Sequence, residues 1–298
     1  CLVGSEMCIR DRVENEVFFR ANGFKLGDVA QSMTIHDGTA YIVVNNSGIV
    51  FGIDPETFRI ERVIRGIGSP RYICFNDSVA YVTSLYEPRI AVVDVATAAV
   101  ADYIETPDHT STEQMAIWGD TLYVSCWSYD DAVLMVDLTS GEVAGEIGVR
   151  SQPRQIALDG DGRLWVLTDG GYGEGSSPKP PALYRIDVAS GSIEREFVFR
   201  MGDTPRGLAV GAGGDTVYFL NGDVWRMDTD AEELPREPFI PASNTIYYAL
   251  GVDPRRGDIY VGDAIDYQQQ GVVYRFSADG RGLDTLRVGI IPTDFCFR

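Results

Sequence analysis

Histidine and cysteine are scarce in this chain of 298 residues, and their scarcity excludes several kinds of chemistry. The two histidines, His36 and His109, are too few to build a histidine-rich metal centre. The five cysteines include no Cys-x-x-Cys pair, so we expect neither a disulfide framework nor a zinc site. A Gly-x-Ser-x-Gly elbow and a glycine-rich phosphate loop are also absent. We therefore expect no enzymatic activity, no metal and no cofactor.

The chain also has few positively charged residues relative to negatively charged ones. The chain has 25 Lys and Arg residues against 44 Asp and Glu residues, which gives a formal net charge of -19. The field of such a charge repels nucleic acids and anionic membranes, so we expect no nucleic-acid partner. No apolar run reaches the ~18 residues that a transmembrane helix needs.

A repeated unit is the most informative feature that is present. It recurs six times, at a spacing of roughly 40 to 50 residues. Each copy opens with a short apolar segment, continues with an aromatic-aliphatic strand, and then has a strand that ends in Asp and a charged outer strand. The second strands contain Tyr41-Ile42-Val43, Tyr81-Val82-Thr83, Tyr123-Val124-Ser125, Trp165-Val166-Leu167, Tyr218-Phe219-Leu220 and Tyr260-Val261-Gly262. About four short strands per repeat, with apolar residues on both faces, predict an all-β propeller of packed blades.

The two ends of the chain lead us to expect a seventh blade. Residues 291–297 resemble another opening strand, and residues 13–19 read as an outermost strand. We therefore predict a seven-bladed β-propeller over residues 13–298, with one incomplete blade shared between the two ends. Residues 1–12 resemble a translated sequencing adapter, so we expect them to be a non-native segment and the true N-terminus to be missing.

Polar and aromatic residues gather in the segments that should open on one axial face. These are the loops between blades and the loops between second and third strands, and a rim of aromatic and amide groups suits a broad ligand. We predict that the ligand-binding residues are Gln31, Arg71, Tyr86, Gln114, Trp127, Tyr129, Arg154, Asp169, Tyr172, Arg206, Asn221, Tyr248, Asp263, Asp266 and Tyr267.

Two repeated features have a structural interpretation. The Pro-Arg pairs that contribute Arg71, Arg154 and Arg206 recur at blade openings, where each Arg either meets a ligand or pairs with an Asp of the next blade. The Asp residues at strand ends are typical turn formers. They are Asp54, Asp94, Asp137, Asp187 and Asp228.

Several motifs resemble one known group of propellers. Ala80-Tyr81-Val82-Thr83 and Leu122-Tyr123-Val124-Ser125 are similar to the Tyr-Val-Thr-Asn repeat of surface-layer and YncE-like propellers. Together with Gly68-Ser69-Pro70-Arg71, Gly257-Asp258-Ile259-Tyr260 and Asp263-Ala264-Ile265-Asp266-Tyr267, they resemble the YncE-like propeller lipoproteins of Bacteroidetes. That group includes the BtuG-type cobalamin-binding proteins.

This resemblance implies a lipid-anchored protein of the cell surface or outer membrane. It implies cobalamin or a related corrinoid as the ligand and a TonB-dependent outer-membrane transporter as the partner. The lipobox cysteine of that group is not found here, which we attribute to the missing N-terminus. Two other readings stay open. One is a structural or protein-interaction propeller without a small ligand, and the other is a propeller lyase or lactonase.

Overall fold

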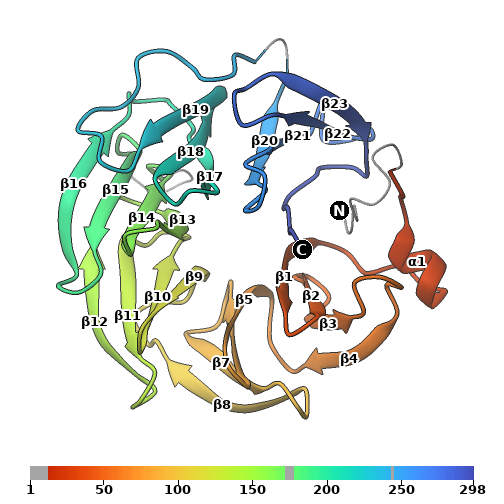
Figure 1. The fold of residues 1–298 in the computed structure, drawn as a ribbon. Helices are drawn as coiled ribbons and strands as arrows, with labels where there is room; N and C mark the ends of the chain where they lie inside the picture. Colours follow the sequence, from red (N-terminus) through yellow and green to blue (C-terminus); the bar gives the residue numbers. More distant parts are fainter. Residues whose placement is uncertain (1–12, 172–177, 243–244) are drawn as a thin grey trace.

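The computed structural model describes residues 13–171, 178–242 and 245–298, and these residues form a ring of six small antiparallel sheets (Figure 1). The sheets follow one another in chain order around a central axis, and the first strand of each lies nearest that axis. The prediction of an all-β propeller is therefore confirmed. The predictions for residues 1–12 and for Tyr172 lie outside the described residues.

The first three blades each have four strands. Blade 1 comprises β1 (Ala30–His36), β2 (Thr39–Val44), β3 (Ile49–Ile53) and β4 (Ile60–Arg65). Blade 2 comprises β5 (Pro70–Asn76), β6 (Val79–Ser84), β7 (Arg89–Asp94) and β8 (Ala99–Glu105). Blade 3 comprises β9 (Thr112–Trp118), β10 (Thr121–Cys126), β11 (Ala132–Asp137) and β12 (Glu142–Gly148).

The second half of the ring is less regular. Blade 4 comprises β13 (Pro153–Leu158), β14 (Arg163–Thr168), β15 (Ala182–Asp187) and β16 (Ser192–Val198). Blade 5 has three strands, β17 (Arg206–Val210), β18 (Thr216–Asn221) and β19 (Asp223–Asp228), and Ile240 makes an isolated bridge to Val224 at its outer edge. Blade 6 comprises β20 (Tyr247–Val252), β21 (Ile259–Asp263), β22 (Val272–Phe276) and β23 (Gly282–Arg287).

The core lies between neighbouring blades rather than within any one of them. Every residue of β2 is buried, because both faces of this strand are covered. Between blades 1 and 2, for example, Tyr41 and Val43 pack in one cluster with Ile73 and Val82. This arrangement explains why the second strands are apolar on both faces, whereas outer strands such as β12 expose most of their residues.

The aspartates at strand ends form turns, as predicted. The Asp54 carboxylate accepts hydrogen bonds from the backbone N–H groups of Glu56 and Thr57, at 2.8 and 2.9 Å. Asp94, Asp137 and Asp187 accept the equivalent bonds in the next three blades. These hydrogen bonds lower the pKa of Asp54, because they favour the ionised carboxylate.

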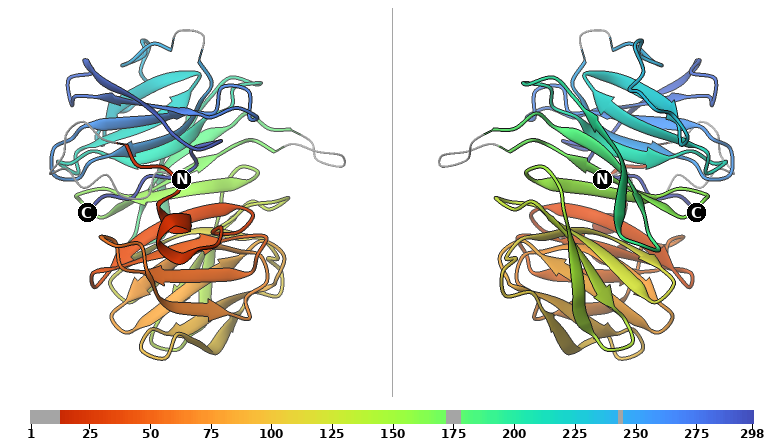
Figure 2. Two further views of the ribbon diagram at one scale, coloured as in Figure 1. Left: turned by 90° about the vertical axis from the view of Figure 1, so that its right-hand side faces the viewer. Right: turned by 90° about the vertical axis from the view of Figure 1, so that its left-hand side faces the viewer.

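The prediction of seven blades is wrong, since the described residues form six. Residues 13–19, expected to form an outermost strand, form none, and their last three residues begin helix α1 (Val17–Asn22), which packs on blade 1 (Figure 2). Its Phe18 is buried against Phe51, with ring centroids 5.2 Å apart. The β-propensity of Val17, Phe18 and Phe19 predicted a strand, but packing against blade 1 overrides that preference.

The C-terminal segment, residues 288–298, lies between blades 6 and 1 without forming a strand. The Met33 N–H donates to Asp294 at 2.9 Å, and the Thr293 hydroxyl donates to the Ala30 carbonyl at 3.2 Å. Ile291 has a φ of 53° and Pro292 has no N–H, so a regular ladder cannot begin there. The segment closes the ring through side chains rather than as an added blade. No helix among the described residues is long and apolar enough to cross a membrane.

Candidate ligand-binding site

The candidate site lies where the inner strands begin, at one end of the axis around which the blades are arranged. The first residues of β5, β9, β13, β17 and β20 converge there around the axis (Figure 1). We call this place the axial mouth and define it by Arg71, Glu113, Trp127, Arg154, Asp169, Arg206 and Tyr248.

Arg71 is fixed by a buried ion pair across the boundary between two blades. Its Nε and Nη2 atoms donate to the two carboxylate oxygens of Glu113, both at 2.6 Å, and its Nη1 atom donates to Gln31 at 2.8 Å. Arg71 thus pairs with an acidic residue of the next blade, as the structural interpretation of the Pro-Arg repeat predicted, but the acid is Glu113 of β9 rather than the expected Asp.

Trp127 lies between two of the arginines. The guanidinium carbons of Arg71 and Arg154 lie 5.6 and 5.2 Å from its ring centroid, within the range of cation–π attraction. Its indole N–H donates to Asp169 at 3.0 Å. Burial raises the pKa of Asp169, and this effect outweighs the opposing hydrogen bonds from Trp127 and the Gly171 amide. The ring is therefore held at its edge and presents its faces to two cations.

Arg154 and Arg206 differ from Arg71. Both are half-buried, and within the described part of the chain neither guanidinium has a hydrogen-bond or ion-pair partner. The guanidinium carbon of Arg206 lies 5.6 Å from the ring centroid of Tyr248. The rings of Tyr248 and Tyr267 pack edge-on, with their centroids 5.8 Å apart. Burial is the largest effect on the pKa of Arg154 and lowers it, but the combined attraction of Glu113, Tyr72 and Tyr248 outweighs burial, so this pKa is raised. Two oriented cations thus face the mouth.

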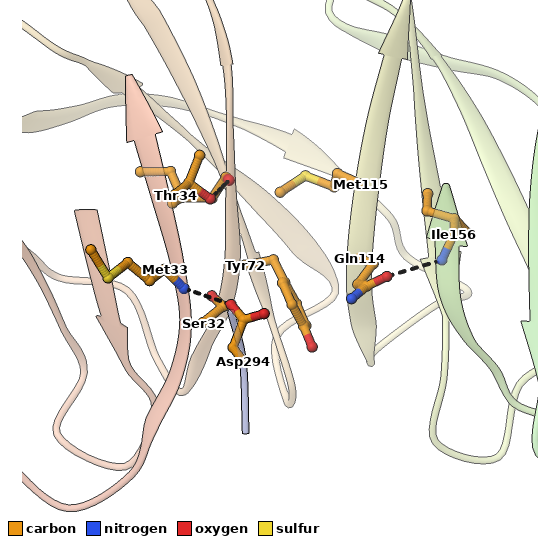
Figure 3. A pocket seen from close by; sticks show the side chains of 9 residues that line it. Ser32, Met33, Thr34, Tyr72, Gln114, Met115, Ile156 and Asp294 are labelled. Carbon is orange, nitrogen blue, oxygen red and sulfur yellow. Dashed lines mark hydrogen bonds between the residues drawn. The ribbon is translucent and has the colours of Figure 1, made fainter. Parts of the chain in front are cut away.

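A cavity of about 220 Å³ adjoins the mouth, one or two residues further along the inner strands (Figure 3). Tyr72, Gln114 and Asp294 provide polar groups to its wall. Gln114 accepts a hydrogen bond from the Ile156 N–H at 3.0 Å, so its carbonyl oxygen is used by the fold. Its amide nitrogen remains on the cavity side. The wall is completed by Ser32, Met33, Thr34, Ile73, Met115 and Ile156.

Two titratable groups in this cavity are strongly affected by burial. Burial raises the pKa of Asp294 to about 6, because the ring of blades removes the carboxyl from bulk water while the Met33 and Phe295 amides only partly compensate. Burial also raises the pKa of Tyr72 to about 12, and the Glu113 carboxylate adds to this effect. Tyr72 therefore stays a neutral hydrogen-bonding group at physiological pH.

Comparison with known proteins identifies the family. The family model described as "Domain of unknown function (DUF5074)" matches residues 8–288. The chain belongs to this family. The sequence matches no curated protein.

Solved structures similar to this DUF5074 protein support the propeller fold alone. Hydrazine synthase from Kuenenia stuttgartiensis aligns with a TM-score of 0.75 and 17% identity, over 90% of this chain and 89% of that one. A quinoprotein alcohol dehydrogenase-like protein from Bacteroides thetaiotaomicron VPI-5482 aligns with a TM-score of 0.68 and 15% identity, over 91% of this chain and 70% of that one.

The structure of the DUF5074 protein brings many of the predicted residues together. Two groups of predicted residues are linked by direct contacts. The first comprises Gln31, Arg71, Trp127, Arg154 and Asp169. The second comprises Arg206, Tyr248 and Tyr267. Gln114 lines the neighbouring cavity. Tyr86 and Tyr129 are 74% and 68% exposed and lie in the loops that follow β6 and β10.

Three other predicted residues accept hydrogen bonds from the backbone. Asn221 accepts a hydrogen bond from the Thr204 N–H at 3.3 Å. Asp263 is buried and accepts hydrogen bonds from two backbone N–H groups, those of Ile246 and Ile265. Asp266 stabilises a turn by accepting from the N–H groups of residues 268 and 269. Their spacing in loops resembled that of ligand contacts because turn formers and polar ligand contacts are the same residue types.

Proposed function

We propose that this DUF5074 propeller binds a small anionic molecule at the axial mouth. The observation that supports the proposal is the pair of half-buried guanidinium groups, Arg154 and Arg206, whose N–H donors have no partners in the described residues. A guanidinium has five donors and matches the oxygens of a phosphate or carboxylate. Donors that are held in a partly dehydrated site and not used by the fold favour an incoming anion.

The surroundings favour a ligand with a broad, apolar body. Trp127 and Tyr248 offer aromatic surface directly beneath the cations, and the exposed Tyr267 ring packs edge-on against Tyr248. Tyr86 and Tyr129 add exposed aromatic rings in the loops after β6 and β10. Aromatic side chains give large contact areas at a low entropic cost. The adjoining cavity of about 220 Å³ is smaller than typical ligand pockets, so it suits one substituent of a ligand rather than the whole.

We propose a corrinoid as the first ligand to test. Its nucleotide phosphate would meet Arg154 and Arg206, while its amide-fringed ring would lie across the mouth on the exposed tyrosines. The net charge of -19 does not oppose this, because charges beyond about 8 Å are screened at physiological salt. A TonB-dependent transporter as partner and a lipid-anchored surface location stay predictions that rest on the resemblance.

Binding without catalysis is the simplest role for this mouth. Within the described residues, it presents cations, aromatic faces and two carboxylates that are engaged by Arg71 and Trp127. None of the residues that define it is a histidine or a cysteine, the residues that most often supply a base or a nucleophile.

Isothermal titration calorimetry with cyanocobalamin tests the proposal. The double variant Arg154→Gln/Arg206→Gln should weaken binding at least tenfold, because each charge-assisted hydrogen bond contributes about 1.5–3 kcal/mol. The exposed Arg59→Gln variant serves as the control and should bind like wild type. Cobinamide, which lacks the nucleotide phosphate, should bind the wild-type protein more weakly than cyanocobalamin.

The outcomes separate the ligand from the site. Cyanocobalamin binding that is unchanged in the double variant would show that the mouth is not the site. Binding of a phosphate monoester but not of cyanocobalamin would keep the anion site and exclude the corrinoid. If neither ligand binds, the proposal fails.

A further inference from the structure

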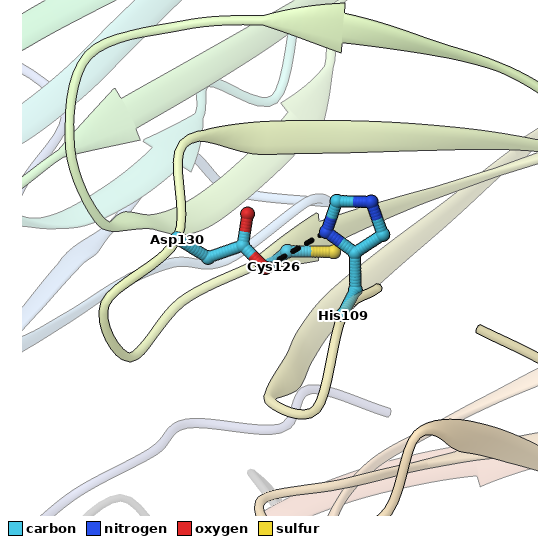
Figure 4. Close-up of side chains that lie close together, drawn as sticks. All are labelled: His109, Cys126 and Asp130. Atoms are coloured by element: carbon cyan, nitrogen blue, oxygen red, sulfur yellow. Dashed lines mark hydrogen bonds and ion pairs between the residues drawn. The ribbon is translucent and has the colours of Figure 1, made fainter. Parts of the chain in front are cut away.

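Three side chains of different chemistry meet away from the axis, at the edge of blade 3. His109 lies in the loop before β9, Cys126 ends β10, and Asp130 lies in the loop between β10 and β11 (Figure 4). One ligand atom of each residue lies within 4.8 Å of the other two. The imidazole Nδ1 atom is 2.8 Å from the Asp130 carboxylate. Sequence spacing gave no hint of this group, because the loops bring the residues together only in the folded chain.

The backbone holds the three residues in place. The Thr106 hydroxyl donates to the His109 carbonyl at 2.8 Å, and the His109 N–H donates to the Thr106 carbonyl at 2.9 Å. The carboxylate oxygen of Asp130 that faces away from the imidazole accepts the Asp131 N–H at 2.7 Å. Cys126 is fully buried. A set of ligands fixed in this way loses little conformational freedom when an ion binds.

We propose that His109, Cys126 and Asp130 form a binding site for a divalent transition metal of the zinc type. Zinc takes sulfur, nitrogen and carboxylate ligands together, whereas calcium and magnesium require oxygen. Three protein ligands leave a fourth position of a tetrahedral site for water or another molecule. When the ion binds, the Cys126 thiol and the Nδ1–H group of His109 each lose a proton to solvent, and bonds to the metal replace the hydrogen bond between His109 and Asp130.

Glu146 on β12 supports this assignment as an outer partner. Its carboxylate lies 3.3 Å from the Nε2 atom of His109, on the opposite edge of the ring from Asp130. A carboxylate that accepts the remaining N–H of a metal-binding histidine fixes the tautomer and the ring orientation. Once its proton has been released, the Nδ1 atom faces Cys126 and Asp130 as a metal ligand.

The site lies at the base of a loop that also reaches the axial mouth. The Asp130 N–H donates to the Trp127 carbonyl at 2.9 Å, and the Asp130 carbonyl accepts the Gln152 N–H at 2.7 Å. A bound ion would therefore restrain the loop that carries Trp127. The metal proposal does not depend on ligand binding at the mouth, since it rests on a separate group of residues.

Cobalt substitution tests the site directly. The chain of 298 residues with Cys1→Ser and Cys8→Ser is titrated with Co²⁺, and absorbance spectroscopy follows the sulfur-to-cobalt charge-transfer band. We expect one equivalent to bind, the band to appear, and Zn²⁺ to abolish it. Adding Cys126→Ser should remove the band, whereas the matched control Cys74→Ser, whose thiol lies outside the cluster, should keep it.

Further variants separate ligands from supporting residues. His109→Gln and Asp130→Asn should each weaken Co²⁺ binding at least tenfold, and Glu146→Gln should weaken it about 10- to 100-fold as an outer partner. Circular dichroism establishes that each variant is folded. X-ray absorption of the zinc-loaded parent protein reads the sulfur and nitrogen ligands without relying on the buried Cys126→Ser substitution. A band that survives in Cys126→Ser, a zinc spectrum without a sulfur ligand, or the absence of stoichiometric binding would overturn the proposal.

Discussion

Arg71 and Glu113 form a buried, two-pronged ion pair that joins the inner strands of blades 2 and 3. Both N···O distances are 2.6 Å, and the side chains are 8% and 0% exposed. Two charges removed from water in this way depend on each other, because either one alone would be left uncompensated. The pair therefore links the stability of the ring to the geometry of the axial mouth, since Arg71 also faces Trp127.

Removing the acid should destabilise the protein strongly. We expect Glu113→Gln to lower the free energy of unfolding by about 3–5 kcal/mol, since it leaves the Arg71 charge buried without a charged partner. Urea denaturation measures the effect. Glu87→Gln is the matched control, because its pair with Arg89 is 3.1 Å long and more exposed, and its loss should change stability by about 0–1 kcal/mol. Equal effects of the two substitutions would contradict this account.

Substitution of Arg154, in contrast, should change the free energy of unfolding only slightly. Its guanidinium is half-buried and unpaired within the described residues, so Arg154→Leu removes a desolvated charge and loses mainly the cation–π contact with Trp127. That contact contributes about 0.5–1 kcal/mol, and we expect a change in unfolding free energy below about 1 kcal/mol. Urea denaturation checks this. A loss as large as that of Glu113→Gln would show that Arg154 supports the fold rather than a ligand.

The repeat predicted the fold class but not the number of blades. Recurrent strands such as Tyr81-Val82-Thr83 have a period that local pattern alone reveals, because each blade packs only on its neighbours. The ends of the chain lack that repetition. Whether residues 13–19 become a strand or a helix depends on Phe18 finding a place against Phe51, which is a tertiary contact and is not visible in the sequence.

The sequence predicted only part of the candidate site, because the repeat determines which positions converge but not which tertiary contacts they make. Loop position indicated that Arg71, Trp127 and Arg154 would meet around the axis, because equivalent positions of successive repeats converge. It did not reveal which arginine is paired. Asp294 was missed altogether, since its place at the cavity depends on the path of the C-terminal segment between blades 6 and 1.

Stability should depend on pH through Asp294. Its pKa of about 6 in the folded protein lies above the ordinary value of 3.8, so the folded state holds a proton that the unfolded chain has released between these values. The contribution of Asp294 to the free energy of unfolding is therefore largest at low pH, and it is lost as the pH rises from about 4 to about 6. The contribution is at most about 3 kcal/mol, from about 1.36 kcal/mol per pKa unit.

Comparison of urea denaturation at about pH 4.5 and pH 7.5 measures this effect. The loss of stability between the two pH values should be smaller in Asp294→Asn than in wild type. Asp37→Asn, a change at a turn residue whose side chain is 90% exposed, is the control and should follow wild type. Parallel curves for all three proteins would rule out Asp294 as the source.

Gly251 should be required for the C-terminal segment to dock. A methyl group on this buried β20 residue would lie 2.6 Å from the Cβ atom of Phe295, so Gly251→Ala must displace that side chain. Overpacking of this kind costs about 1–3 kcal/mol, and we expect faster amide hydrogen exchange in residues 293–298 together with a lower urea midpoint. Gly282→Ala on β23 is the matched control, because a methyl group there meets no atom within 4 Å and should leave both measurements near those of wild type. If Gly251→Ala left exchange in the segment unchanged, the packing of Phe295 against β20 would not be what holds the segment between blades 6 and 1.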